Sequence, residues 1–290
     1  MNAVRVLAGV GAPAEAAGVS ARGALTEPAP VRVGLTAVAL LFLGLFLLLP
    51  LGLVFAEAFR GGAGAWLAAI RDPDALAAFR LTALVVAIAL PINLAFGLSA
   101  AWAIARFRFR GRALLLTLID LPFAVSPVVA GLVLMLLLGR QGVLGPWLDH
   151  AGVQALFAVP AIVLATLFVS SPFIAREVIP VMEAGGGHEE EAARLLGASG
   201  LQTFARVTLP NITWGVVYGV TLSSARVVGE FGAVSVVSGR IRGLTNTLPL
   251  HVEAVYNEYN LQAAFAVASV LTGLALVTLA ARAVAERHAR

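Results

Sequence analysis

Long apolar stretches make up most of the chain, and the short polar segments between them hold most of its charges. A helix that crosses a bilayer needs about 20 mostly apolar residues. Six stretches meet this requirement: Leu35–Ala56, Leu81–Ala105, Ala113–Gly139, Ala151–Ala175, Asn211–Ser238 and Tyr259–Ala281. The predicted fold class is therefore all-α, a polytopic membrane protein with six transmembrane helices.

The polar segments set the predicted domain boundaries. Residues 1–32 are rich in Ala, Gly and Pro and lack periodicity, so we predict a mobile tail there. A single transmembrane domain is expected over residues 33–284. It includes a long polar connection at residues 176–210, and a short tail follows at 285–290.

Prolines interrupt several of the predicted spans, and the third span is the most affected. Pro122 and Pro127 flank Ser126, and Gly131 follows closely. Neighbouring helices or hydroxyl groups can satisfy the carbonyls that a proline leaves free. The pattern is compatible with a broken or kinked stretch that lines a cavity, and at least as well with ordinary kinked packing.

Composition excludes several functions. Hydrophobic residues make up 60% of the chain and charged residues only 12%, which suits a bilayer rather than water. There is no cysteine, and all 20 basic residues are arginine. Without lysine the chain has no phosphate-binding Walker lysine, so any ATP hydrolysis requires another chain. We expect no cofactor or metal site.

The arginines also predict orientation. With the N-terminus in the cytoplasm, thirteen arginines fall on the inner side and six on the outer side. This excess fits the positive-inside rule, and the run from Arg106 to Arg112 is its strongest element. Both termini and residues 176–210 are then cytoplasmic. The net charge of +4 reflects this distribution beside apolar spans and not nucleic-acid binding.

The polar connection encodes a helix, a tight turn and a second helix. Glu189–Glu191 suit the positive end of a helix dipole, and Glu190 is four residues from Arg194, a spacing that favours an ion pair. Gly197 suits a left-handed C-terminal position. Ser199 and Gln202 have the spacing of a capping box that starts the second helix. Its predicted apolar stripe is Leu201, Phe204 and Val207.

This segment resembles the EAA loop of ABC importer permeases. The family pattern is EAA, three residues, Gly, nine residues, an aliphatic residue, one residue and Leu-Pro. The matching positions here are Glu191, Ala192, Ala193, Gly197, Val207, Leu209 and Pro210. The resemblance implies that the loop docks into a groove on a separate ATPase subunit. The alternative is a plain amphipathic loop between spans.

Arg226–Gly239 resembles the fifth span of oxyanion permeases for sulfate and molybdate. Three other segments resemble the W-type subunit of sulfate/thiosulfate permeases: Thr245–Asn260, Leu116–Val133 and Leu195–Asn211. The resemblance implies an inner-membrane protein without catalytic activity of its own. It implies three kinds of partner: ATPase subunits, a second homologous permease and an extracytoplasmic sulfate-binding protein.

Charges within the fifth span are candidates for an anion pathway. Arg226 and Glu230 are four apart and therefore share a helix face. Charges at membrane depth usually face the bundle interior or water. A pathway role and a structural ion pair remain alternatives. Ser235, Ser238 and Ser126 are hydroxyl candidates for the same pathway, although serines in helices often bond their own backbone.

Two rival functions remain open from the sequence. The closer one is a permease for molybdate, tungstate or another oxyanion. The other is an ion-driven secondary transporter, which would need no ATPase partner. An intramembrane enzyme is disfavoured because the spans hold no H-E-x-x-H, G-x-S-x-G or paired catalytic aspartates.

Overall fold

The structure is a computed structural model that describes residues 28–288 of the 290-residue chain. Every regular element in that range is a helix, which agrees with the predicted all-α class. The chain divides into two units, residues 1–50 and 51–290, which are described separately.

The first unit contains α1 (Ala29–Leu43), the π-helical segment η1 (Gly44–Leu48) and the start of α2 (Leu49–Ala58). The widened turn lies just before Pro50, whose ring nitrogen cannot donate to the preceding turn. The predicted N-terminal tail falls mostly on residues 1–27, outside the described residues. α1 begins at Ala29, six residues before the predicted start of the first span.

The second unit contains the remaining helices. They are α3 (Gly62–Arg71), α4 (Pro73–Arg106), α5 (Arg112–Ala124), α6 (Pro127–Leu138), α7 (Gly145–His150), α8 (Val159–Ser170), α9 (Pro172–Ala184), α10 (His188–Leu195), α11 (Gly200–Thr203), η2 (Phe204–Thr208), α12 (Leu209–Asn211), α13 (Thr213–Val228), α14 (Gly232–Val237), α15 (Leu248–Asn257) and α16 (Leu261–His288). α16 is thus helical through most of the predicted C-terminal tail.

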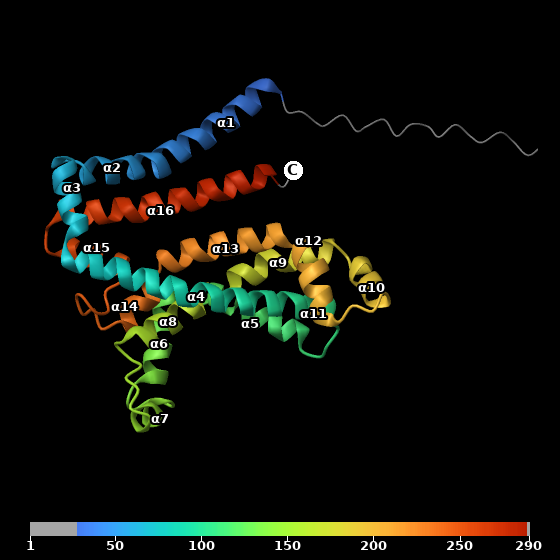
Figure 1. Cartoon of the computed structure of the whole chain (residues 1–290). Coiled ribbons are helices and arrows are strands. Elements are labelled where there is room, and N and C mark those ends of the chain that lie inside the picture. The colour runs from blue at the N-terminus through green and yellow to red at the C-terminus, as the bar shows by residue number, and fades with distance from the viewer. Residues whose placement is uncertain (1–27, 289–290) are drawn as a thin grey trace, which may run out of the picture. The chain divides into compact units, whose positions relative to one another are not determined.

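The longest helix, α4, packs against α9 and α13 (Figure 1). Its N-terminus is capped by Asp72, whose carboxylate accepts from the Asp74 and Ala75 backbone N–H groups. A Cβ at Gly97 of α4 would lie 2.7 Å from Cγ2 of Ile174 in α9, and a Cβ at Gly219 of α13 would lie 2.9 Å from Cα of Ile174. Small residues therefore bring these helices together, as is common in membrane bundles.

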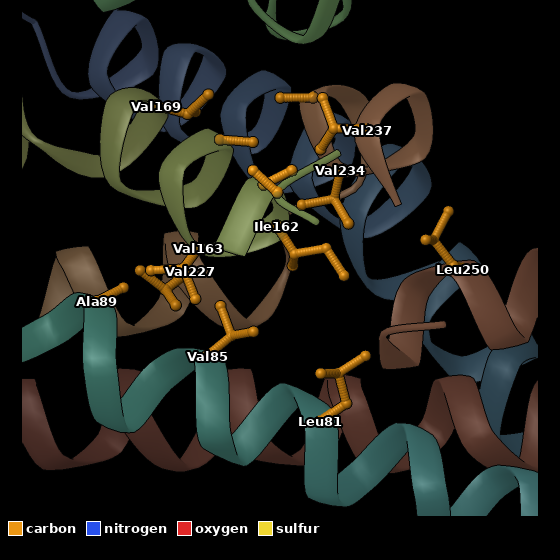
Figure 2. Close-up of a cluster of buried hydrophobic side chains, with 14 of the residues drawn as sticks. Leu81, Val85, Ala89, Ile162, Val163, Val169, Val227, Val234, Val237 and Leu250 are labelled. Carbon is orange, nitrogen blue, oxygen red and sulfur yellow. The ribbon is translucent and has the colours of Figure 1, made fainter. Parts of the chain in front are cut away.

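A buried apolar cluster joins α4, α8, α13 and α14. Figure 2 shows Leu81, Val85 and Ala89 of α4 near Ile162 of α8 and Val234 of α14. A second cluster, around Ile174 and Met182 of α9, lies farther along the same bundle. Together the clusters fix α4 and α9 along most of their lengths.

All six predicted spans fall on apolar helices, but several of their ends differ. Within residues 28–288, five helices are long and apolar enough to cross a membrane, and the α5–α6 pair brings the number to six if that pair is one span. The fourth span was predicted from Ala151 and instead covers Val159–Ala184. Residues before it form turns, because Gly152 has φ of 67° and the Phe157 N–H donates to the Val237 carbonyl.

Interruptions divide several of the predicted spans, and in the fourth Ser171 separates α8 from α9. The third bends by 107° between α5 and α6, at Val125 and Ser126. The fifth is interrupted between α13 and α14, at residues 229–231. The third span is therefore broken, whereas its lining of a cavity stays a prediction, and the break in the fifth span was not predicted.

Candidate functional site

The polar connection folds as its sequence predicts, into a helix, a tight turn and a second helix. α10 begins with Glu189–Glu191 in its first turn. Gly197 has φ of 89°, the left-handed conformation expected after a helix end. The Ser199 hydroxyl accepts from the Gln202 N–H, and the Gln202 side-chain oxygen accepts from the Ser199 N–H. The two hydrogen bonds complete the capping box.

The predicted Glu190–Arg194 ion pair is wrong. Glu190 instead pairs with Arg106 at the end of α4, whose Nε lies 2.9 and 3.0 Å from its two carboxylate oxygens. Thr208 of η2 donates to the same carboxylate at 2.8 Å. The Arg106 side chain is only 15% exposed, and its Nη1 also donates to the Met182 carbonyl near the end of α9.

Several large apolar side chains of this helix–turn–helix are exposed to solvent. Leu195, Leu196 and Leu201 are 89%, 90% and 78% exposed. The predicted stripe therefore holds only in part: Phe204 packs on Trp102, with ring centroids 5.0 Å apart, whereas Leu201 faces away. We define the coupling-loop patch as Leu195, Leu196 and Leu201. An exposed apolar patch of this kind is typical of a docking surface.

The residues at EAA spacing divide between this surface and the bundle. Glu191, Ala192 and Gly197 are exposed, and Ala193 is half-buried. Leu209 packs against the second apolar cluster, and Pro210 is exposed.

The breaks in the third and fifth spans pack against each other. A Cβ at Gly131 of α6 would lie 2.7 Å from the Ala233 carbonyl oxygen, and one at Gly232 of α14 would lie 2.8 Å from Cβ of Pro127. The backbones of α6 and α14 therefore approach as closely as glycine allows.

The Arg226–Glu230 pair lies at the second of these breaks. Glu230 is 2% exposed, and its Oε2 lies 2.6 Å from Nη1 of Arg226. That approach is a charge contact: among the described residues Oε2 accepts no well-aligned hydrogen bond. The other oxygen, Oε1, accepts from the Ala233 N–H at 2.9 Å and so caps α14. The two residues therefore form an ion pair that also caps α14, and a role in the pathway stays a prediction.

The three candidate serines differ in their contacts and in their burial. Ser235 donates to the Gly232 carbonyl, as serines in helices often do. Ser238 is fully buried and accepts from the Arg240 N–H. Ser126 is exposed at the start of α6 and makes no capping hydrogen bond.

Among the ion pairs that the sequence did not predict, three join α4, α5, α9 and α10. Asp120 pairs with Arg176 at 2.6 Å, and Glu183 with Arg112 at 2.7 Å. The third is the pairing of Arg106 with Glu190, which are 84 residues apart. The arginines at 106 and 112 were interpreted only as topology signals. No local spacing joins residues so far apart, so the sequence offered no means of finding these pairs.

A polar pocket of about 380 Å³ lies between α3, the start of α4, α15 and the start of α16. His251 lines it, is 4% exposed, and has an Nδ1 without a hydrogen-bond partner among the described residues. Burial lowers the pKa of His251 below 6.5, against the opposing effect of Asp72 and Asp74. No group of three His, Cys, Asp or Glu side chains suited to a metal occurs in the described residues.

Residues 93–290 match the family described as "Binding-protein-dependent transport system inner membrane component". The chain is 52% identical over 245 residues to the sulfate transport system permease protein CysW of Escherichia coli (strain K12), covering 84% of each. It is 51% identical over 258 residues to the CysW protein of Synechocystis sp. (strain ATCC 27184 / PCC 6803 / Kazusa), covering 89% of this chain and 94% of that one. Identity to the Escherichia coli (strain K12) sulfate transport system permease protein CysT is 39%, over 83% of this chain and 87% of that protein.

A solved structure has a similar fold. It is the crystal structure of a bacterial ABC transporter involved in the import of the acidic polysaccharide alginate. The match has a TM-score of 0.71 and 17% sequence identity, and it covers 89% of this chain and 94% of that one. At this identity the match establishes the fold alone.

Proposed function

The chain belongs to the family of binding-protein-dependent transport system inner membrane components, and on that premise we propose that it is the membrane-spanning permease subunit of an ATP-driven importer of sulfate and thiosulfate. The observation that carries this proposal is the 52% identity to a CysW sulfate permease over 84% of both chains. The lower identity of 39% to the CysT protein favours the W-type subunit.

The ATPase partner is inferred from the coupling loop. The coupling-loop patch presents three leucines to solvent next to the residues at EAA spacing. The chain has no lysine, and so no Walker lysine to hold a nucleotide phosphate. A separate ATPase that covers the patch would supply both the missing apolar contact and the hydrolysis. This chain itself would contribute passage and coupling.

Two further partners complete the proposed assembly. A second, homologous permease would form the pathway together with this chain, and an extracytoplasmic sulfate-binding protein would deliver the anion. Closure of the ATPase pair would move the coupling loops, and the pathway would alternate its access between the two sides. The arginine distribution supports an inner-membrane orientation with both termini in the cytoplasm.

Uptake into proteoliposomes tests the proposal. The vesicles would contain this chain, a CysT-type permease and the ATPase, with ATP inside and the binding protein outside. We expect accumulation of radiolabelled sulfate that requires ATP and is competed by thiosulfate. Uptake driven by an ion gradient without ATP would replace the proposal with a secondary transporter. ATP-driven uptake of molybdate or tungstate in preference to sulfate would retain the importer and change its substrate.

A further inference from the structure

α10 is held to the membrane-embedded bundle in an unusual way. Glu190 is its only buried residue, and its carboxylate is paired with Arg106. The two leucines at its end are almost fully exposed. A helix in a globular domain normally docks through an apolar face. Here the buried contacts are polar and are made by one carboxylate, which pairs with Arg106 and also accepts from the Thr208 hydroxyl of η2.

The backbone on both sides of α10 is rich in glycine. Gly185, Gly186 and Gly187 precede the helix, and Gly186 has φ of 64°. Gly197, with φ of 89°, follows it. Glycine permits large backbone rotations at low cost. The flanking backbone therefore transmits rotation of α10 to the bundle poorly, and we infer that side-chain contacts transmit it instead.

Arg106 connects Glu190 to two helices of the bundle, α4 and α9. Its Nε contacts both oxygens of Glu190, and its Nη1 donates to the Met182 carbonyl of α9 at 2.8 Å. The Arg106 and Glu190 side chains are only 15% and 11% exposed, so water screens the pair weakly. Planar guanidinium groups fix the direction of a contact as well as its distance.

The contact lies at the end of the long helix α4. This helix runs from Pro73 to Arg106, with Pro91 inside it, and packs against α8, α9 and α13. Near its other end, the Thr82 hydroxyl accepts from the Leu248 N–H at the start of α15. A force applied at Arg106 is thus delivered along about 50 Å of helix, at 1.5 Å per residue.

We propose that Arg106 and Glu190 are positioning residues that transmit movement of α10 to α4, so that the pair couples the ATPase cycle to the pathway. This inference rests on the proposed function. It differs from an anchoring role because the pair is needed for transport per ATP, and not only for folding or ATPase binding.

The test uses the complete importer in proteoliposomes, with ATP hydrolysis and sulfate uptake measured together. Glu190→Gln and Arg106→Gln remove the charge pair. The matched control is Glu183→Gln, which breaks the nearby but half-exposed pair with Arg112. We expect sulfate imported per ATP to fall at least tenfold in the two test variants, with hydrolysis within threefold of wild type. The control should stay within twofold on both measures.

A chemical rescue separates transmission from folding. The chain has no cysteine, so Arg106→Cys combined with Glu190→Cys introduces its only two thiols. In complexes with cysteine-free partners, a short bifunctional thiol reagent should restore sulfate per ATP to at least half the wild-type value. A reagent of the same length with one reactive end should not.

Three results would overturn the inference: a wild-type ratio in either Gln variant, a cross-linked complex that stays uncoupled, or failure of both Gln variants to assemble with the ATPase. The last would make the pair a folding element. The wild-type arm judges the proposed function separately, because absence of ATP-driven sulfate uptake there would reject the importer itself.

Discussion

Replacing Gly197 with valine tests the turn that separates the two short helices of the coupling loop. The backbone there has φ of 89°, and an added Cβ would meet no atom of the chain within 4 Å. The cost of a side chain within this chain is therefore conformational and not steric crowding. Left-handed backbone costs an L-residue about 1–2 kcal/mol, and a β-branched residue such as valine is the least tolerant of positive φ.

That cost has a measurable consequence. A change of 1–2 kcal/mol shifts an equilibrium about 5–30-fold, so Gly197→Val should depopulate the observed turn without unfolding the transmembrane bundle. We expect normal insertion and abundance in the membrane, abolished sulfate uptake and weaker recovery of the ATPase in a pull-down.

Two companion variants separate conformation from docking clearance. Asparagine tolerates the left-handed region far better than valine and is of similar size. If the turn conformation matters most, the loss of sulfate uptake should be smallest in Gly197→Asn, larger in Gly197→Ala and largest in Gly197→Val. If clearance for the ATPase matters most, asparagine and valine should be equally harmful. Normal ATPase recovery and normal ATP-dependent uptake in the valine variant would refute a coupling role for this turn.

Three further predictions concern other parts of the chain. Neutralising Arg226 or Glu230 alone should destabilise the protein by about 1–3 kcal/mol and impair transport more than neutralising both. A double variant whose impairment equals the sum of the two single variants would show that the residues are uncoupled. Reporter fusions after Gly145 and after Gly187 should report opposite sides of the membrane, and a common side would reject the predicted topology. Because burial lowers the pKa of His251, the unfolded chain binds a proton first as pH falls below 6.5, so thermal stability should decrease there, and His251→Gln should flatten that decrease.

The sequence predicted features that depend on neighbouring residues. The capping box at Ser199 and the left-handed Gly197 are decided within a few residues, and both are confirmed. The apolar spans follow from the bilayer requirement, and all six predicted stretches coincide with apolar helices.

Features that depend on distant contacts were missed. The start of the fourth span was wrong because the Phe157 N–H bonds to Val237, 80 residues farther along the chain. An ion pair of Glu190 with Arg194 was predicted because the two residues are close in sequence. Its observed partner, Arg106, is 84 residues away, and no sequence spacing indicates that contact. The break at Glu230 was also missed, although its cap is local: the Glu230 carboxylate accepts from the Ala233 N–H, three residues farther along the chain.

The three exposed leucines of the coupling-loop patch also affect the fate of subunits that are made without their partners. A copy made without its partners carries Leu195, Leu196 and Leu201 into water. Contiguous exposed apolar surface promotes aggregation and marks a protein for cellular triage. Surplus subunits are therefore expected to be short-lived. Matched synthesis of the permease and the protein that covers this patch would set the amount of importer in the membrane.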